Sequence, residues 1–158
     1  MVMSRETNRG LKIKIATPAA LIDIVDGIDE CIVPTEDGEV GILGDHVKLV
    51  AALGTGVLRY EKAGKVSFFV VSGGLVEVQN NEVSVLADVG ESGMSIDVRR
   101  ARESLERARK RVGGGATEVG VSVDFARALL AEKRALARIA AAEAQQAAGS
   151  AGRVPKSS

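Results

Sequence analysis

Residues 66–88 read VSFFVVSGGLVEVQNNEVSVLAD, and this stretch decides how the first half of the chain folds. Apolar residues fill almost every position of 66–71, which is typical of a strand covered on both faces. Gly73 and Gly74 follow, and glycine tolerates the backbone angles of a tight bend. Asn80 and Asn81 predict a hairpin turn, because asparagine accepts a positive φ. The stretch therefore predicts paired strands with a sharp bend.

The same signals continue on both sides of this stretch. Residues 11–15 (LKIKI) alternate apolar side chains with lysines, as expected for a strand with one buried face. A second turn signal, KAGK, stands at 62–65. Short strands separated by frequent turns predict a β-sandwich or barrel over residues 11–93.

The second half of the chain has a helical composition. Residues 96–148 are rich in Ala, Arg and Glu, and no proline stands between Pro34 and Pro155. One apolar stripe has helical spacing and consists of Val98, Ala101, Leu105, Ala108 and Val112. We therefore predict an antiparallel two-helix hairpin over residues 94–148.

The ends of these helices are marked by capping residues. Asp97 or Ser95 is expected to cap the first helix, and the glycines at 113–115 to end it. Ser122 and Asp124 are expected to cap the second, which runs to about Ala148. Its apolar stripe is mostly alanine and buries little area, at about 25 cal/mol per Å². We infer that the hairpin is held weakly and can detach from the surface it packs on.

The charge of the chain is divided between these two parts. The 158 residues include 21 Lys and Arg and 21 Asp and Glu, for a formal charge of zero. Residues 1–95 carry a net −6 and residues 96–158 a net +6. The neutral total argues against a nucleic-acid binder, which is normally basic.

Compartment signals point to the inside of the cell. The N-terminus lacks the apolar core of a secretory signal, and no apolar run approaches the ~20 residues of a membrane span. The single cysteine, Cys31, fits a reducing setting. Residues 1–10 and 149–158 show no periodicity and are expected to be flexible tails.

Catalytic patterns are missing from the sequence. His46 is the only histidine and has no second ligand at metal-binding spacing, so we expect neither a metal nor a required cofactor. Ser72 lacks the G-x-S-x-G frame of a nucleophile elbow, and Gly64-Lys65 is no phosphate-binding loop. An enzyme built on a β-sandwich scaffold is therefore disfavoured.

The arginines of the hairpin form a separate feature. Arg100 and Arg107 lie two turns apart on the first helix, and Arg134 and Arg138 lie one turn apart on the second. In an antiparallel hairpin these side chains can converge, and guanidinium groups bind phosphate bidentately. The alternative is a solvated basic face, partly neutralised by pairs such as Glu103 with Arg107.

Three motifs occur in a recognisable order. Residues 38–46 read GEVGILGDH, residues 71–78 read VSGGLVEV and residues 83–88 read VSVLAD. With Ala-Thr-Pro at 16–18, they resemble the signature segments of the epsilon subunit of F-type ATP synthases, in the same order and spacing. The resemblance extends over residues 11–148.

The resemblance implies a fold and partners. The fold is a flattened ten-stranded β-sandwich followed by two α-helices. The sandwich binds the gamma subunit and rests on the ring of c subunits, at the cytoplasmic face of the bacterial cell membrane, without entering the membrane. The extended hairpin inserts among alpha and beta subunits and inhibits ATP hydrolysis. The function implied is a non-catalytic rotor subunit of a proton- or sodium-driven ATP synthase.

The signature loop implies a contact with the c-ring. Residues at its contact positions are Asp37, Glu39 and His46. This loop departs from the family pattern at Gly44 and Asp45, where the family has Pro and Gly. We expect a more flexible loop and an altered contact.

The start of the helical hairpin implies a nucleotide site. Residues 96–101 (IDVRRA) resemble the motif with which several bacterial members bind ATP as a regulatory ligand. The matching positions that surround adenine are Glu91, Ile96, Asp97 and Ala101, and those that take the phosphates are Arg100, Arg107, Arg134 and Arg138. Without a partner complex, the same residues would make a free-standing ATP-sensing module, which is the alternative function.

Overall fold

The computed structural model describes residues 10–114 and 123–151. Most of the expected tail 1–10 lies outside the described residues, as do the cap residue Ser122 and most of the loop from Gly113 to Val121. Of the expected tail 149–158, residues 149–151 belong to the last helix, which is longer than predicted.

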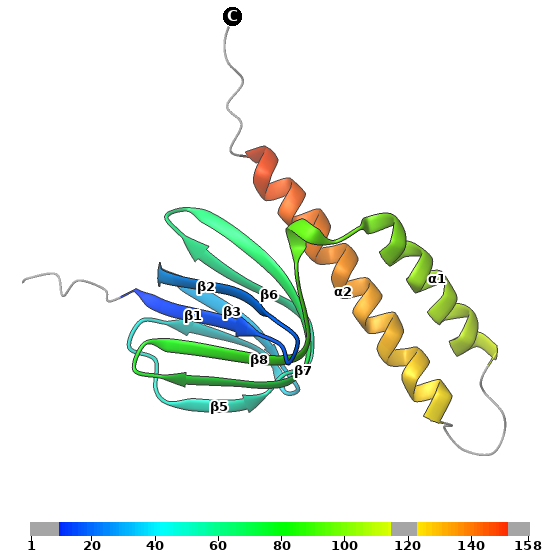
Figure 1. Cartoon of the computed structure of the whole chain (residues 1–158), viewed down its shortest axis with the longest axis horizontal. Coiled ribbons are helices and arrows are strands. Elements are labelled where there is room, and N and C mark those ends of the chain that lie inside the picture. The colour runs from blue at the N-terminus through cyan, green and yellow to red at the C-terminus, as the bar shows by residue number, and fades with distance from the viewer. Residues whose placement is uncertain (1–9, 115–122, 152–158) are drawn as a thin grey trace, which may run out of the picture.

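The chain forms strands first and helices afterwards (Figure 1). The strands are β1 (Leu11–Ala16), β2 (Leu21–Ile28), β3 (Glu30–Thr35), β4 (Gly38–Leu43), β5 (Leu49–Ala52), β6 (Thr55–Lys62), β7 (Lys65–Gln79) and β8 (Glu82–Ser92). A short 3₁₀ turn, η1 (Gly93–Ser95), leads into α1 (Val98–Gly114) and α2 (Val123–Ala151).

One bent sheet makes both layers of the sandwich. Its strand order is β2-β1-β8-β7-β6-β3-β4, and β5 also pairs with β7. The first half of β7 pairs with β6, and its second half pairs with β5. Both β7 and β8 therefore run through a first layer with β6, β3 and β4, and through a second layer with β5, β1 and β2.

The bend between the layers depends on Gly74. Its φ is +98°, and a Cβ there would lie 2.0 Å from the carbonyl oxygen of Leu86. Only glycine combines a positive φ with so close an approach of two backbones. The predicted bend at Gly73-Gly74 is thus the corner of the sandwich.

The number of strands differs from the expected ten. The described residues form eight, because β7 and β8 pass from one layer to the other as unbroken strands. Their pairing keeps one register from Phe69 opposite Ser92 to Gln79 opposite Glu82. Each long strand serves both layers, so a sandwich is formed with fewer separate strands.

Both predicted hairpin turns are confirmed. Ala63 and Gly64 have φ of 50° and 77°, and Asn80 and Asn81 have φ of 51° and 60°. Two successive positive φ values are the mark of a type I′ turn, whose backbone twist matches that of paired strands.

The core lies between the two layers. The largest fully buried side chains include Leu11, Ile13, Ile15, Ile28, Ile42 and Leu58. Burying each one stabilises the fold by about 1.5–3 kcal/mol. Cys31 is also buried here, and burial raises the pKa of its thiol to about 12, so this thiol is unreactive.

The helices pair along a seam of alanines. Ala101 and Ala108 of α1 are buried, as are Ala128, Ala135 and Ala142 of α2, and each set repeats every seven residues. Arg102 pairs with Glu143 at 3.3 Å and Arg109 pairs with Glu132 at 3.1 Å, so residue numbers rise along α1 as they fall along α2 and the helices run antiparallel. The predicted hairpin is therefore confirmed. Asp97 caps α1 by accepting a hydrogen bond from the backbone N–H of Arg100 at 3.1 Å.

A second alanine face of α2 packs on the first layer. Ala137 and Ala141 contact a cluster that contains Val70, Val57 and Phe68. Figure 1 shows α2 between the sheet and α1. No helix among the described residues has the length and apolar content that crossing a membrane requires.

The corner of the sandwich can be tested by comparing Gly74→Ala with Gly64→Ala. Both glycines have a positive φ, so both substitutions incur a backbone strain of roughly 1–2 kcal/mol. Gly64 has open space around it, whereas Gly74 meets the Leu86 carbonyl. We expect Gly74→Ala to lower the free energy of unfolding by more than about 4 kcal/mol, as measured by urea denaturation. Equal losses for the two variants would contradict this account of the bend.

Candidate functional site

A cleft lies where α2 crosses the strands near the corner of the sandwich. Its volume is about 250 Å³, close to the lower end of the roughly 300–1,000 Å³ that small-molecule sites occupy. It is lined by Val70, Val89, Glu91, Ser104, Ala131, Arg134, Ala135 and Arg138. Both helices and both long strands thus contribute to one site.

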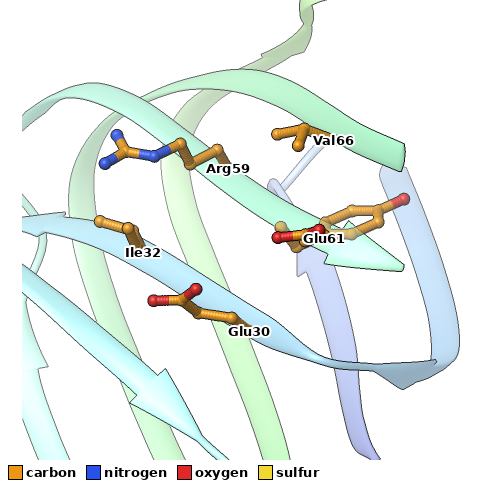
Figure 2. Close-up of a pocket in the computed structure, with 6 residues that line it drawn as sticks. Glu30, Ile32, Arg59, Glu61 and Val66 are labelled. Carbon is orange, nitrogen blue, oxygen red and sulfur yellow. The ribbon is translucent and has the colours of Figure 1, made fainter. Parts of the chain in front are cut away.

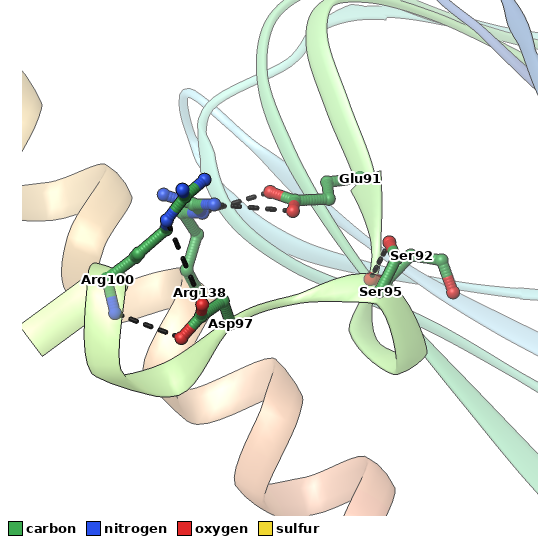
Figure 3. A network of polar contacts seen from close by, with 6 residues as sticks. All are labelled: Glu91, Ser92, Ser95, Asp97, Arg100 and Arg138. Carbon is green, nitrogen blue, oxygen red and sulfur yellow. Dashed lines mark hydrogen bonds and ion pairs between the residues drawn. The ribbon is translucent and has the colours of Figure 1, made fainter.

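Arg138 is held in this cleft by Glu91. Its Nε donates to Oε2 of Glu91 at 2.9 Å and its Nη2 donates to Oε1 at 3.3 Å (Figure 3). The two side chains are 30% and 29% exposed. This bidentate pair joins the end of β8 to the middle of α2, and so connects the acidic and basic parts of the chain.

Arg134 is held by a buried hydroxyl. Its Nε donates to Oγ of Ser72 at 3.0 Å, and Ser72 also shares a hydrogen bond of 2.8 Å with the hydroxyl of Thr55. Ser72 is only 1% exposed. Ser72 is neutral, so this hydrogen bond leaves the positive charge of Arg134 uncompensated.

The α1 arginines have partners on their own helix. Arg100 pairs with the cap residue Asp97 at 3.9 Å (Figure 3), and Nη2 of Arg107 donates to Oγ of Ser104 at 2.9 Å. Ser104 lines the cleft, so Arg107 lies beside it. Of the four predicted phosphate residues, the structure places Arg134 and Arg138 in the cleft, whereas Arg100 and Arg107 are not among its lining residues.

Of the residues expected around adenine, some lie at the cleft and one is buried between the helices. Glu91 lines the cleft, and Ile96 packs on Val70 and the alanines of α2. Ala101 is fully buried in the helix seam, so its side chain is not presented to a ligand in this arrangement.

Sequence reasoning missed Ser72 and Ser104 as parts of this site. The sequence marks Ser72 only as a possible nucleophile, yet its hydroxyl positions an arginine that stands 62 residues later in the chain. No local pattern encodes a contact of that range. Arg134 and Arg138 both line a cleft with an apolar wall, and guanidinium groups are suited to binding anions.

Polar and close contacts fix α2 to the sheet above the cleft. The side chain of Gln145 accepts the backbone N–H of Phe68 at 3.0 Å. Gly93 is buried, and a Cβ there would lie 2.9 Å from the carbonyl oxygen of Phe68 and 3.1 Å from that of Ala141. α2 can approach the strands this closely only because residue 93 is glycine.

The three residues of the expected ring contact do not gather at one point. Asp37 is exposed in the turn before β4, and Glu39, on β4, forms an ion pair with Arg59 at 3.7 Å. His46 lies beyond the other end of β4, where its Nδ1 is 2.7 Å from the carbonyl oxygen of Val47. At about 3.3 Å per residue, β4 separates the two ends by roughly 17 Å.

The loop around His46 is tied to the β7–β8 turn. The N–H of Asp45 donates to Oδ1 of Asn81 at 2.6 Å, and Nδ2 of Asn81 donates back to Oδ1 of Asp45 at 3.3 Å. Asp45 has a φ of 61°, a conformation that aspartate tolerates better than most residues. Asp45 is one of the two loop residues that depart from the family pattern, and its hydrogen bonds with Asn81 hold it in place.

A smaller hollow lies on the outer face of the first layer. It measures about 80 Å³, and Figure 2 shows Glu30 and Glu61 around it with Arg59. This volume is far below that of a small-molecule site. Within the described residues, no group of three or more His, Cys, Asp or Glu side chains could hold a metal ion.

An exposed apolar row crosses the outer face of the second layer. Strand pairing places its members directly opposite one another, in the order Ala52, Leu75, Leu86, Ala16 and Leu21. Its leucines are 41%, 50% and 55% exposed in that order, and Val50 and Ile24 beside the row are 62% and 49% exposed. Exposed aliphatic side chains aligned across neighbouring strands make this face a candidate interaction surface.

Comparison with known families covers both parts of the chain. Residues 10–93 match the ATP synthase delta/epsilon chain β-sandwich domain. Residues 95–143 match the ATP synthase delta/epsilon chain long α-helix domain.

Similar proteins are named ATP synthase epsilon chains. The chain is 40% identical to that of Desulforamulus reducens over 132 residues, which cover 84% of this chain and 96% of the relative. It is 40% identical to that of Symbiobacterium thermophilum over 134 residues, with 85% and 94% covered.

Two solved structures share the fold. A chain of the Euglena gracilis mitochondrial ATP synthase matches with a TM-score of 0.72 and 20% identity, covering 89% of this chain and 86% of that one. A chain of the Tetrahymena thermophila mitochondrial ATP synthase central stalk and c-ring matches with a TM-score of 0.55 and 16% identity, covering 85% and 98%.

The close approach of α2 can be tested with Gly93→Ala. The added methyl group pushes α2 away from β7, at a cost of about 1–3 kcal/mol, so we expect the hairpin to separate from the sandwich more often. Spin labels at Lys65→Cys and Gln146→Cys would report this as longer and broader distances, and buried Cys31 stays unlabelled.

Gly113→Ala is the matched control for this test. Gly113 lies near the end of α1 with open space around it, so its replacement should leave the distances unchanged. Unchanged distances in both variants would show that Gly93 does not govern docking.

Proposed function

The chain belongs to the ATP synthase delta/epsilon family, and from this premise we propose that its sandwich joins the gamma subunit to the c-ring while its hairpin regulates ATP hydrolysis. As an epsilon chain it is a non-catalytic subunit of the central stalk. The proposal concerns which surfaces meet which partner, and it rests above all on the exposed apolar row.

The apolar row is the docking surface for gamma. It spans five strands of the second layer, and α2 covers the opposite side of the molecule, so the row stays open whether or not the hairpin is docked. Its members are aliphatic, and burying Leu75, Leu86 and Leu21 against a partner would stabilise the complex by several kcal/mol at about 25 cal/mol per Å². A permanent rotor joint requires an apolar interface of this kind.

The ring contact uses the turns at the ends of the strands. Asp37, Glu39 and His46 come from the turn before β4, from β4 and from the loop after it. Their separation along β4 favours two small contacts over one. Exposed carboxylates there can pair with basic or amide groups on polar loops of the ring, which would hold the chain peripherally at the cytoplasmic face of the cell membrane.

The hairpin acts as the regulatory element. Its alanine face on the sandwich is small, and the polar contacts of Arg134, Arg138 and Gln145 can form with other partners. Release of α2 would let the helices extend toward alpha and beta subunits and inhibit hydrolysis. The docked and extended states would then differ by only a few kcal/mol, within reach of a ligand.

ATP is the proposed ligand that favours the docked state. Its phosphates would lie against Arg134 and Arg138 in the cleft, with Arg100 and Arg107 approaching from α1, and its adenine near Glu91, Ile96 and Asp97. Ala101 would reach the base only after a small separation of the helices. Support comes from the convergence of two guanidinium groups on one cleft.

The gamma interface is tested by Leu86→Glu. A charged side chain in the middle of the apolar row must be desolvated on binding, so we expect co-purification with gamma from the same source to be lost. Leu43→Glu, at 57% exposure on β4, is the matched control and should leave the complex intact. If Leu86→Glu still binds gamma normally, the row is not the interface.

The nucleotide site is tested by titration calorimetry of ATP. Arg134→Ala removes a charge-assisted hydrogen bond and should weaken ATP binding by roughly tenfold or more. Arg99→Ala removes an exposed arginine of α1 outside the cleft and should have little effect. Absence of heat with the unsubstituted chain would leave these arginines only their contacts with protein partners.

A further inference from the structure

The cleft already contains a negative charge. The Glu91 carboxylate lies on Nε and Nη2 of Arg138 at 2.9 and 3.3 Å, in the bidentate arrangement that a phosphate group would adopt. Both side chains are about two-thirds buried, so solvent screens their attraction less than at an open surface. The docked hairpin therefore keeps Arg138 neutralised without a ligand.

The other arginines near the cleft are not neutralised in the way that Glu91 neutralises Arg138. Arg134 and Arg107 are held by the hydroxyls of Ser72 and Ser104, which leave their charge uncompensated. Asp97 faces Arg100 but also caps α1, so its position is required by the helix. Glu91 is the carboxylate that reaches the cleft from the sandwich, and the described contacts give it no partner besides Arg138.

We propose that Glu91 is an internal counter-ion that competes with phosphate groups for Arg138 and so sets the ligand concentration at which the cleft fills. A phosphate that takes the same edge of the guanidinium must displace the carboxylate. A phosphate that takes the remaining edge lies next to the carboxylate and is repelled by it. In both geometries the charge of Glu91 lowers the affinity.

This competition gives the hairpin two alternative ways of staying docked. With no ligand, Glu91 ties α2 to β8. With ligand, phosphate bridges the arginines of both helices and the carboxylate is released. The inference rests on the proposed phosphate site, and it gives the carboxylate of Glu91, which lies near the proposed adenine position, a separate and opposing effect on the phosphates.

Glu91→Gln tests whether the carboxylate of Glu91 competes with phosphate or helps to hold the ligand. The amide keeps the shape and hydrogen-bonding capacity of Glu91 but removes its charge. Titration calorimetry would compare the affinities of the full chain and the variant for ATP and for inorganic tripolyphosphate. We expect Glu91→Gln to bind both ligands about threefold or more tightly, as removal of a partly exposed repulsion predicts. Tighter binding of tripolyphosphate alone would also support the inference, and would show that the competition needs no nucleoside.

The docked state supplies a second readout. Spin labels at Lys65→Cys and Gln146→Cys should show a docked hairpin in the unsubstituted chain without ligand. In Glu91→Gln the docked fraction should fall without ligand and recover when tripolyphosphate is added. Glu143→Gln, which breaks the exposed pair with Arg102 outside the cleft, is the control and should change neither affinity nor docking.

The remaining outcomes overturn the inference. Weaker or unchanged binding by Glu91→Gln, with normal binding by the unsubstituted chain, would overturn the competition and leave the proposed site standing. Absence of binding by both proteins would overturn the site and the competition together.

Discussion

The close approach of Gly74 to the carbonyl of Leu86 is the constraint on which the rest of the structure depends. Because two backbones meet there, β7 and β8 can turn from one layer into the other without breaking their pairing. The turn places Ser72 on one side of the corner and Leu75 on the other, three residues apart. One therefore holds an arginine of α2, while the other belongs to the exposed apolar row.

The helix α2 is built to bind weakly on two faces. Alanines at 128, 135 and 142 pack on α1, and those at 137 and 141 pack on the sheet. Alanine permits close approach but buries few carbon atoms, so each contact contributes little hydrophobic free energy. Docking then depends more than usual on directional contacts, namely those of Arg134, Arg138 and Gln145. Such contacts can be exchanged for others at small net cost, which suits an element that changes position.

Local features of this fold could be predicted from the sequence, and long-range ones could not. The turns at 62–65 and 79–82 follow from Gly64, Asn80 and Asn81, which accept a positive φ, although the positive φ of Ala63 does not follow from its residue type. The stripe from Val98 to Val112 follows from helical periodicity. The apolar row depends on which strands become neighbours, including the parallel pairing of β1 with β8, which no local signal encodes. In the cleft, the arginines were found by spacing and resemblance, but the bond from Arg134 to Ser72 depends on how α2 crosses the sheet. The ring residues lie on a strand and two turns whose separation only the structure reveals.

The parallel pairing of β1 with β8 also orders events during synthesis. Lys12 pairs with Glu82, so β1 can pair with β8 only after some seventy further residues have been made. At about 5–20 residues per second this delay lasts several seconds, during which β2 is already available as a partner on the other edge of β1. The helices follow β8 in the chain, so the sandwich can close before α2 exists. The nascent hairpin thus emerges beside a finished surface and can dock as soon as it folds.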